Sequence, residues 1–511
     1  MAEHRLRELP ASFLKVETKD EAETRSFAED IAMILKAGDV VCLSGDLGAG
    51  KSTFARALIR TLADDDLLDV PSPTFTLVQS YELPRFDLAH LDLYRLEEPE
   101  EIEELGLPDL LQSGAALIEW PEMAEDLLPQ DALWIQISQP DDDDHDEGRR
   151  RFDLYAQQQA WRDRIGQTRD TRAFLQGAGF TGVARRFLAG DASLRTFESI
   201  AGVDGKRVLM RWPFREGGVP ESVRTYMKSV HLAEDCRAVL AIGMELRKRG
   251  IRAPETIAAD PEKGLVLLED LGRDTIVVGG KPDPERYEAA VEVLARMHSQ
   301  TWPGTVALPE GGRYVLQPYS DKALIAEASL FLDWYVPEVG QTPVDAAMRT
   351  DFEALWQQSL DGIADAQRGW VLRDFHSPNL LWQEGASGTD RIGLIDLQDT
   401  VIGPVAYDVA SLLLDARTDI GTDLETRLYD AYVGKMETLS PGFDRQSFSR
   451  AYSVMAAQRI TKILGIFVRL ARRDSKPSYL SHLPRMIGYL DRVFERPGMS
   501  DLKDWYGQFR H

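Results

Sequence analysis

The 511-residue sequence has very little cysteine and no long apolar segment. Cys42 and Cys236 lie too far apart in the chain to form the framework of a small disulfide-rich domain. No stretch approaches the roughly eighteen consecutive apolar residues of a transmembrane helix, and the first ten residues contain no apolar signal core. These absences predict a soluble protein of the reducing cytoplasm.

Positive charge is also scarce. Lys and Arg total 59 against 84 Asp and Glu, which gives a formal net charge of −25. Such a chain has no broad positive field to collect nucleic acid or an anionic membrane surface, so we expect neither strong direct nucleic-acid binding nor membrane binding. Local features must hold any nucleotide. The composition is otherwise globular, 43% hydrophobic, and the length predicts about two to four domains.

A dense run of charge divides the chain. Residues 141–151 read DDDDHDEGRRR, and like charges packed this closely repel one another and cannot form a core. We therefore predict an acidic linker over 140–164, which separates a first domain at 1–139 from a second domain at 165–511.

The expected secondary structure differs on the two sides of this linker. Before it, apolar strand-like runs alternate with helical patterns, which predicts an α/β sheet. The strand-like runs are 40–44, 90–96, 115–120 and 133–138, and the helical patterns are 52–63 and 99–112. After it, a helical pattern and two strand-like runs precede a long region of amphipathic helix; they cover 160–176, 206–212 and 264–270. The second domain is expected to have a small strand-containing lobe over 165–272 and a larger helical lobe over 273–511.

A phosphate-binding motif follows the first strand of the first domain. Residues 45–52 read GDLGAGKS, which matches GxxxxGK[ST] after an apolar strand and at the start of a helix. Glycines let backbone N–H groups surround phosphate oxygens, while the lysine supplies a charge and the serine hydroxyl a Mg²⁺ ligand. The residues expected at this nucleotide site are Gly45, Gly48, Gly50, Lys51, Ser52 and Thr53.

Two carboxylates at strand ends are candidates for the metal side of this site. Glu119 ends the apolar run at 115–120, where a Walker B acid would reach the metal through water. Asp92, in the run at 90–96, is a second candidate. On their own, both are also compatible with surface carboxylates of an alternating strand.

Several motifs together resemble TsaE, the ATPase subunit of the bacterial tRNA threonylcarbamoyladenosine synthesis machinery. They are GDLGAGKSTFARAL (45–58), SPTFTLVQSY (72–81), HLDLYRL (90–96), LG (105–106) and IEWPE (118–122). The resemblance covers about residues 10–139. It implies ATP and Mg²⁺ binding by Lys51 and Ser52, with Glu119 and Asp92 near the metal and the γ-phosphate.

The same resemblance implies a mobile element and protein partners. Thr74, Phe75 and Thr76 would form a switch-like segment. The partners would be the catalytic and scaffold subunits of the modification complex, which are TsaD-like and TsaB-like proteins. Because these partners would grip most of the tRNA, an acidic ATPase domain is compatible with tRNA modification.

A second constellation lies in the second domain. WVLRDFHSPNLL (370–381) and LIDLQD (394–399) place Asp374 five residues before Asn379 and 22 residues before Asp396. This is the layout of a kinase catalytic loop followed by a metal-binding aspartate. Asp374 would accept or orient the proton of the attacking hydroxyl, and Asn379 and Asp396 would hold Mg²⁺ on the phosphates.

Motifs across the second domain resemble the aminoglycoside phosphotransferase family, which has a protein-kinase-like fold. They are RFLAGDASLRTF (186–197), LEDLG (268–272), LRDFHSPNLLW (372–382) and LIDLQDTVIGPVAYDVASLL (394–413). Within the family the pattern is most similar to AmgK-type kinases, which phosphorylate the anomeric hydroxyl of N-acetylmuramate and N-acetylglucosamine. The resemblance, over about 165–495, implies ATP in a cleft between two lobes. It places Gly190 and Ser193 in a nucleotide-covering hairpin and Glu269 to Leu271 at the hinge.

Two positions depart from the family pattern. Leu372 stands where the family has a histidine two residues before the catalytic aspartate, and the nearest histidine is His376. The usual orienting histidine is therefore absent from its position. A phosphate-binding lysine in a strand is also not evident, so we assign this role to Arg211 in preference to Lys206 at the strand start.

The sequence therefore predicts an α/β P-loop NTPase domain followed by an α+β, bilobal protein-kinase-like domain, in one bifunctional chain that uses ATP and Mg²⁺. Two alternatives remain at this stage. In the first, the kinase half would act on an aminoglycoside, a choline-like alcohol or homoserine. In the second, the first half would be a nucleotide-gated binding module with little turnover.

Overall fold

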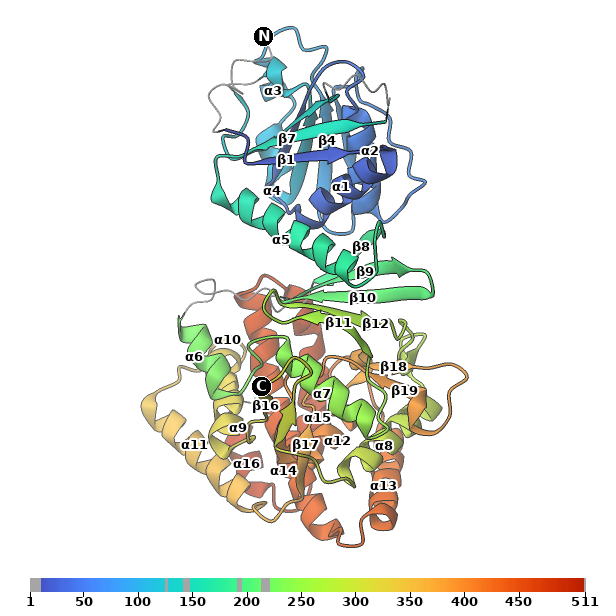
Figure 1. Ribbon diagram of the computed structural model, residues 1–511. Helices are drawn as coiled ribbons and strands as arrows, with labels where there is room; N and C mark the ends of the chain where they lie inside the picture. Colours follow the sequence, from blue (N-terminus) through green and yellow to red (C-terminus); the bar gives the residue numbers. More distant parts are fainter. Residues whose placement is uncertain (1–10, 125–126, 141–147, 191–194, 213–220, 510–511) are drawn as a thin grey trace. The chain divides into compact units, whose positions relative to one another are not determined.

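The structure, a computed structural model, describes the chain except for residues 1–10, 125–126, 141–147, 191–194, 213–220 and 510–511 (Figure 1). The chain divides into two compact units. Unit 1 is Met1–Pro213 with Ile257–Leu267, and unit 2 is Phe214–Thr256 with Leu268–His511. Among the described residues, no helix is long and apolar enough to cross a membrane. Both cysteines are buried.

The first sheet of unit 1 has seven strands. They are β1 (Leu14–Thr18), β2 (Val40–Ser44), β3 (Val78–Tyr81), β4 (Asp87–Asp92), β5 (Gly114–Glu119), β6 (Leu133–Ser138) and β7 (Arg150–Tyr155). Their order is β1-β7-β6-β2-β5-β4-β3. The central strands β6, β2, β5 and β4 are parallel to one another, whereas β1, β7 and β3 pair antiparallel to their neighbours. The carboxyl ends of β2, β4 and β5 therefore meet at one edge, where α/β sheets bind ligands.

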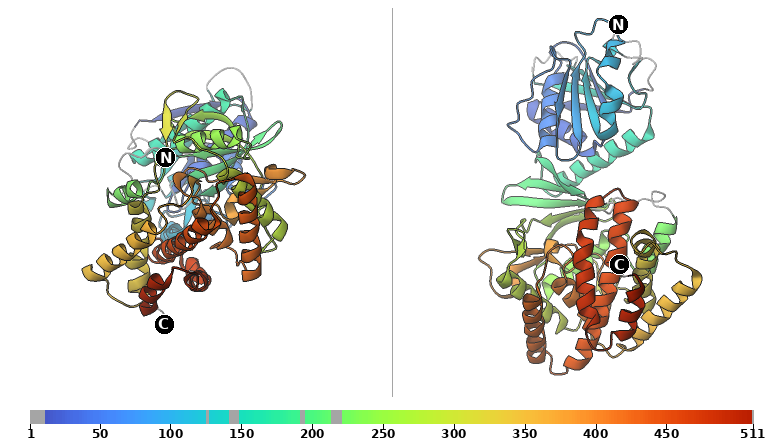
Figure 2. Two further views of the ribbon diagram at one scale, coloured as in Figure 1. Left: turned by 90° about the horizontal axis from the view of Figure 1, so that it is seen from below. Right: turned by 180° about the vertical axis from the view of Figure 1, so that it is seen from behind.

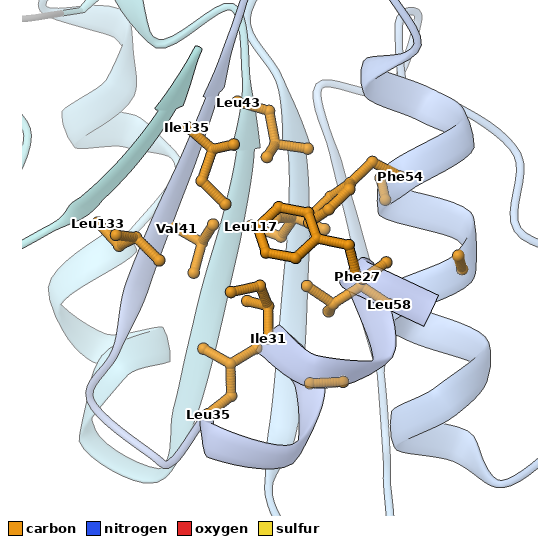
Figure 3. Close-up of a cluster of buried hydrophobic side chains, with 14 of the residues drawn as sticks. Phe27, Ile31, Leu35, Val41, Leu43, Phe54, Leu58, Leu117, Leu133 and Ile135 are labelled. Carbon is orange, nitrogen blue, oxygen red and sulfur yellow. The ribbon is translucent and has the colours of Figure 1, made fainter. Parts of the chain in front are cut away.

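Helices cover both faces of this sheet. They are α1 (Glu21–Ile34), α2 (Lys51–Ala63), α3 (Glu101–Glu104), α4 (Leu107–Ser113) and α5 (Gln159–Gly177). Successive side chains of a strand point to opposite faces. Val41 and Leu43 accordingly join the core with Phe27 of α1 and Phe54 of α2 (Figure 3), while Cys42 joins the core on the other face.

A second sheet of unit 1 has five strands. They are β8 (Arg185–Gly190), β9 (Thr196–Gly202), β10 (Gly205–Arg211), β11 (Thr256–Asp260) and β12 (Leu265–Glu269), in the order β11-β12-β10-β9-β8. Its small core contains Ile200, Leu209 and Leu267, and Leu175 of α5 completes it. We call these five strands the small-lobe sheet. Its strands lie within residues 165–272, the range predicted for a strand-containing lobe, and the bounds of that lobe stay a prediction.

The structure differs from the predicted linker over 140–164. Residues 141–147 lie outside the described residues, but β7 pairs with both β1 and β6, and α5 begins at Gln159. The reason is that apolar and polar residues alternate at the end of the charge run, as they do in a strand. Phe152 and Leu154, which stand between polar neighbours, are buried in the core. Part of the predicted linker is therefore a strand of the first sheet.

Unit 2 is mostly helical. Its helices are α6 (Glu221–Ser229), α7 (Arg237–Lys248), α8 (Pro284–His298), α9 (Asp321–Ala328), α10 (Val336–Glu338), α11 (Ala346–Asp361), α12 (Ala406–Leu413), α13 (Thr422–Leu439), α14 (Arg445–Arg472), α15 (Leu483–Phe494) and α16 (Ser500–Tyr506). The long helix α14 is capped by Asp444 and packs against α9, α12 and α15 (Figure 2).

Short strands interrupt the helices of unit 2. They are β13 (Val277–Val278), β14 (Lys281–Pro282), β15 (Thr305–Ala307), β16 (Arg313–Val315), β17 (Arg368–Val371), β18 (Leu380–Trp382), β19 (Ile392–Leu394) and β20 (Val401–Pro404). Two antiparallel pairs, β17 with β20 and β18 with β19, hold both ends of the predicted catalytic segment.

Candidate active sites

The phosphate-binding loop connects β2 to α2. Gly45, Gly48 and Gly50 all have positive φ, a conformation that glycine adopts without steric cost. At Gly45 the backbone of Ile137 leaves no room for a side chain, because a Cβ there would lie 2.2 Å from the Ile137 carbonyl oxygen. At Gly50 it would lie 3.2 Å from Nε of Arg150, whose guanidinium donates to the Ala49 carbonyl at 2.8 Å. The predicted glycines are therefore required by the shape of the loop.

Lys51 begins α2 and turns back over the loop. Its Nζ atom donates to the carbonyl oxygens of Gly45 at 2.6 Å and Asp46 at 3.0 Å, and lies 3.6 Å from the centroid of the Trp120 ring. Burial lowers the pKa of Lys51, and the negative charges of nearby carboxylates, Glu119 first among them, oppose this shift. The ammonium group is thus held among polar partners at the start of the helix, where an anion is favoured.

Glu119 joins the P-loop to β4. One carboxylate oxygen accepts a hydrogen bond from Ser52 Oγ at 2.9 Å, and the other lies 2.9 Å from Nε2 of His90. Glu119 and His90 are both buried, and Thr53 follows Ser52 in the first turn of α2. The structure therefore brings together the predicted serine and the predicted Walker B acid.

Asp92 organises the segment predicted to act as a switch. Its Oδ2 atom accepts hydrogen bonds from Ser72 Oγ and Thr74 Oγ1, both at 2.7 Å, and its Oδ1 atom accepts from the backbone N–H of Tyr94 at 3.1 Å. Phe75, next to Thr74, is 81% exposed. Asp92 therefore anchors a segment that presents an apolar side chain to solvent.

The oxygen ligands at this edge of the first sheet fit a magnesium ion. Mg²⁺ prefers carboxylate and hydroxyl oxygens together with substrate phosphates and water. Ser52 Oγ and the Glu119 carboxylate provide such oxygens beside the glycine-rich loop, and Asp92 ends the neighbouring strand β4, whose register pairs it with Glu119. The arrangement suits a metal-bound nucleoside triphosphate.

The catalytic loop of unit 2 is held by a buried carboxylate. Asp408 of α12 accepts hydrogen bonds from the backbone N–H groups of Leu372 at 2.6 Å and Arg373 at 2.9 Å, while Arg373 has a positive φ of 68°. Burial raises the pKa of Asp408 to about 7, although the two backbone donors work against this shift. Asp408 thus fixes the two residues that precede the predicted catalytic aspartate.

Asp374 is placed for contact with an acceptor. Its side chain is 37% exposed, and Oδ1 lies 3.9 Å from the buried guanidinium of Arg459. Desolvation alone would raise the pKa of Asp374, but electrostatic interactions with His376, Arg459 and Lys462 outweigh it and hold the pKa below its ordinary value. An ionised carboxylate of this kind accepts the hydrogen bond of an attacking hydroxyl.

Asn379 directly precedes β18, and Asp396 follows β19, the strand that pairs with β18. The Asn379 side chain donates to the Asp374 carbonyl at 3.0 Å, which leaves its amide oxygen as the atom that suits a cation, and the Asn379 carbonyl accepts from the Ile395 N–H at 3.1 Å. Asp396 has a positive φ of 62°. The structure thus links Asn379 to Asp374 and to the segment that carries Asp396.

A buried ion cluster lies beneath the loop. Glu327 of α9 pairs with Arg373 and with Lys462 at 2.8 Å, and it accepts a hydrogen bond from the Tyr319 hydroxyl. Although burial would raise the pKa of Glu327, the two cations lower it below its ordinary value. The cluster therefore keeps Arg373 in place through charge.

Two of the three phosphate-binding residues predicted for the small-lobe sheet lie within the described residues. Gly190 is the last residue of β8, whereas Ser193 lies outside the described residues. Arg211 ends β10, and its guanidinium lies 3.5 Å from Glu198 Oε1 and 3.5 Å from Gln167 Oε1. Burial lowers the pKa of Arg211. Its role toward phosphate stays a prediction.

The predicted hinge residues are held by local contacts of unit 2. Glu269 pairs with Arg252 at 3.1 Å, and its backbone N–H donates to the Glu255 carbonyl at 2.8 Å. The Leu271 carbonyl accepts from Nε2 of Gln383 at 2.9 Å. These contacts connect the end of β12 to the strand pair after the catalytic loop, and nucleotide binding by Glu269 and Leu271 also stays a prediction.

The residues of these sites that were not assigned from the sequence include His90, Asp408 and Arg459. His90 and Asp408 stand inside motifs whose other members were assigned, and strand alternation puts His90 on the same face as Asp92. Arg459 lies on α14, 85 positions after Asp374, in a region with no motif. The first two could have been found from spacing, whereas the third depends on tertiary packing.

Two family models match successive parts of the chain. A family model described as threonylcarbamoyl adenosine biosynthesis protein TsaE matches residues 18–151, and one described as the phosphotransferase enzyme family matches residues 184–445. The N-acetylmuramate/N-acetylglucosamine kinase of Caulobacter vibrioides is 33% identical over 352 residues, which cover 66% of this chain and 95% of that protein. The kinase of the same name from Pseudomonas aeruginosa is 31% identical over 277 residues, which cover 53% of this chain and 77% of that protein.

The first part of the chain has relatives of its own. The tRNA threonylcarbamoyladenosine biosynthesis protein TsaE of Rickettsia bellii is 44% identical over 123 residues, which cover 24% of this chain and 85% of that protein. Both resemblances drawn from the motifs are thereby confirmed, as is the predicted succession of a P-loop fold and a kinase-like fold. The chain belongs to the phosphotransferase enzyme family, and it carries in front of that domain a member of the TsaE family.

Proposed function

We propose that the protein is bifunctional. The TsaE domain is the ATPase subunit of the complex that makes N6-threonylcarbamoyladenosine at position 37 of tRNA. The second domain transfers a phosphoryl group from ATP to the anomeric hydroxyl of N-acetylmuramate and N-acetylglucosamine, a reaction of cell-wall recycling. The observation that carries the proposal is the presence of two separate phosphate-handling constellations, Ser52 with Glu119 in unit 1 and Asp374 with Asn379 in unit 2. The names of the relatives supply the substrates.

In the TsaE domain, each residue has a distinct task. The loop N–H groups and Lys51 bind the phosphates of ATP, and Ser52 and Glu119 hold Mg²⁺ directly or through water. When bound, the metal neutralises charge on the phosphates. Glu119 is also the residue that orients the attacking water. Asp92 keeps the segment at 74–76 in reach of this edge of the sheet.

In the kinase domain, Asp374 orients the anomeric hydroxyl. Its ionised carboxylate accepts the hydroxyl's hydrogen bond and then takes its proton as the phosphoryl group moves. Asn379 and Asp396 provide oxygen ligands for Mg²⁺ on the ATP phosphates. Positioning and charge supply most of the catalysis of phosphoryl transfer, which explains why the loop is tied down by Asp408 and Arg459.

The TsaE domain is proposed to work with TsaD-like and TsaB-like subunits. The net charge of −25 gives the chain no field of its own to hold tRNA. The partner subunits therefore bind most of the tRNA, and this chain supplies ATP hydrolysis.

Two variants test the proposal in the full-length chain. Asp374→Asn is expected to abolish phosphorylation of the amino sugars and to leave ADP binding at the P-loop unchanged. Lys51→Ala is expected to abolish ADP binding at the P-loop and to leave phosphorylation of the amino sugars unchanged. Phosphorylation is measured with N-acetylmuramate and N-acetylglucosamine beside an aminoglycoside, choline and homoserine. No transfer to either amino sugar would refute the kinase assignment, and loss of transfer in folded Lys51→Ala would refute the separation of two sites.

A further inference from the structure

Helix α5 belongs to two hydrophobic cores. Near its start, Trp161 and Ile165 pack into the core of the first sheet, and near its end Leu175 packs with Ile200 and Leu209 of the small-lobe sheet. A helix rises 1.5 Å per residue, so its 19 residues span about 28 Å. Figure 1 shows α5 leading from the first sheet to β8. One continuous helix therefore joins the TsaE domain to a part of the kinase domain.

A completely buried arginine lies where these parts meet. Arg185, the first residue of β8, has 0% exposure. It pairs with both oxygens of Glu198 on β9, at 2.7 and 2.9 Å, and its Nη1 atom donates to Asp30 of α1 at 2.6 Å and to Thr168 of α5 at 2.9 Å. This one guanidinium thus bonds to three elements, one of them a helix of the TsaE domain.

Two further arginines extend the contact. Arg172 of α5 donates to Asp30 at 2.7 Å and to the Val183 carbonyl at 2.7 Å. Arg186 of β8 pairs with Glu29 of α1 at 3.1 Å and with Asp66, which follows the end of α2. We call Arg172, Arg185 and Arg186, with Glu29, Asp30, Asp66 and Glu198, the arginine cluster.

The cluster connects the P-loop to the small-lobe sheet along one helix. Helix α2 begins at Lys51 in the phosphate site, and Asp66 lies just beyond its far end. Arg186, which pairs with Asp66, is the second residue of β8, and β8 ends at Gly190. Arg85 adds a cation–π contact, because its guanidinium lies 4.6 Å from the centroid of the Phe187 ring on β8.

Such a cluster favours one arrangement of its elements. A buried charge that loses its partner is strongly destabilising, so β8 cannot leave α1 without uncovering unpaired groups on both sides. Arg185 and Glu198 are both almost fully buried, and their bidentate geometry leaves little freedom. The TsaE domain and the small-lobe sheet are thus held together by packing and by charge.

We propose that the TsaE domain and the small-lobe sheet form one cooperative unit, and that nucleotide bound at the P-loop stabilises the sheet that would cover the nucleotide of the kinase. The TsaE domain is then an internal partner of the kinase domain. This inference rests on the proposed nucleotide binding at Lys51 and Ser52. It gives the fusion a physical consequence, since occupancy of one site changes the stability of part of the other enzyme.

Linkage sets the size of the effect. Suppose that a ligand binds only the native state and is present at a concentration of about 100 times its Kd. Amide exchange that requires the binding site and the sheet to open together is then slowed about a hundredfold. Amide hydrogen exchange of the full-length chain is therefore measured with and without Mg·ADP, in the wild type and in Lys51→Ala. In the wild type, α2 and β8 to β10 are both expected to exchange about a hundredfold more slowly with nucleotide. In Lys51→Ala the protection that depends on nucleotide at the P-loop is expected to vanish. Any protection that remains in this variant comes from ADP bound in the kinase domain.

Asp30→Asn tests the arginine cluster itself. It is expected to retain protection of α2 and to lose the Lys51-dependent protection of β8 to β10. Glu21→Gln, on the same helix but exposed and paired only with Arg25 among the described contacts, is the matched control and is expected to behave as the wild type. Should Asp30→Asn fail to fold, Asp66→Asn, whose side chain is 76% exposed, is expected to weaken the protection of the same strands.

The outcomes separate the two proposals. Protection of α2 without Lys51-dependent protection of β8 to β10 would overturn the inference and leave the proposed function intact. Protection of β8 to β10 that survives in both Asp30→Asn and Asp66→Asn would overturn the role of the arginine cluster. Absence of any Lys51-dependent protection of α2 would overturn both the inference and nucleotide binding at the P-loop.

Discussion

The Nε2 atom of His90 lies 2.9 Å from Oε1 of Glu119, and both side chains are almost completely buried. The other oxygen of Glu119 accepts from Ser52 at 2.9 Å. The imidazole therefore fixes the carboxylate in the orientation that presents it to the phosphate-binding serine. Groups that orient the ligands of a metal in this way contribute to activity although they touch neither metal nor substrate.

His90→Ala is expected to slow ATP hydrolysis by the TsaE domain about 10- to 100-fold, the range that loss of such an orienting partner causes. The reason is that Glu119 would be free to turn away from Ser52. The measurement is single-turnover phosphate release in an Asp374→Asn background, with the TsaD-like and TsaB-like subunits present.

His90→Gln serves as the control for orientation. Its side-chain amide can donate to Glu119 from nearly the same place, so it is expected to recover most of the activity that alanine loses. Equal rates for the alanine variant and the wild type would contradict the positioning role, and equal losses for both variants would argue for a packing role instead.

Asp408 should give the kinase domain a pH-dependent stability. Burial raises its pKa to about 7, against about 3.9 in an unfolded chain. Between these values the folded state binds a proton that the unfolded state does not, so stability falls as the pH rises from about 4 to about 7, by about 4 kcal/mol. Asp408→Asn does not titrate, and its thermal unfolding midpoint is expected to change less over this range than that of the wild type.

The same variant has a second effect at fixed pH. An amide can accept only one of the two backbone hydrogen bonds from Leu372 and Arg373, which is expected to cost about 1–3 kcal/mol at low pH. Asp351→Asn, on an exposed position of α11, is the control and should leave both properties unchanged. A wild-type pH dependence in Asp408→Asn would show that another group is responsible.

Most of the fold and the chemical motifs could be predicted because they depend on local patterns. β2 and β6 coincide with their predicted ranges, since buried strands read as short apolar runs. Glu119 and Asp92 end neighbouring parallel strands, so their closeness follows from the order of the strands alone. The predicted linker was wrong over β7, because the charge run overlaps the start of a strand that pairs with β6 on one side and with the distant β1 on the other.

The contacts that support the sites could not be predicted in the same way. Arg459, Glu327 and Lys462 meet the catalytic loop from α9 and α14, and no spacing rule relates these helices to Asp374. Arg185 is likewise an ordinary basic residue in the sequence, and its burial depends on the packing of α1, α5 and β8. Charged residues are seldom buried, so a sequence pattern assigns them to the surface.

Arg459→Met tests whether α14 positions the catalytic loop. The guanidinium donates to the Arg373 carbonyl at 2.7 Å and lies 3.9 Å from Asp374, and methionine fills similar space without either interaction. We expect kcat for amino-sugar phosphorylation to fall about 10- to 100-fold with little change in KM, because misplacement of the reacting groups costs rate at this scale. Steady-state kinetics measure both constants.

Arg459→Lys and ADP binding provide the comparison. Lysine keeps the charge near Asp374 but cannot reproduce the planar fork, so its kcat is expected to lie between those of the wild type and the methionine variant. ADP binding at the P-loop should be unchanged in both variants. A rise in KM with unchanged kcat would contradict a role in positioning Asp374.

Two glycines in helices of unit 2 should respond in opposite directions to alanine. Alanine is favoured over glycine within a helix by about 1 kcal/mol, and Gly434 of α13 is exposed with open space around it, so Gly434→Ala is expected to raise the unfolding midpoint. Gly465 of α14 is buried, and a Cβ there would lie 2.3 Å from the carbonyl group of Leu330. Gly465→Ala should therefore lower stability by about 1–3 kcal/mol despite the same gain in helix propensity. Calorimetry of both variants decides this, and a stabilised Gly465→Ala would mean that α14 does not pack against Leu330 as closely as the structure shows.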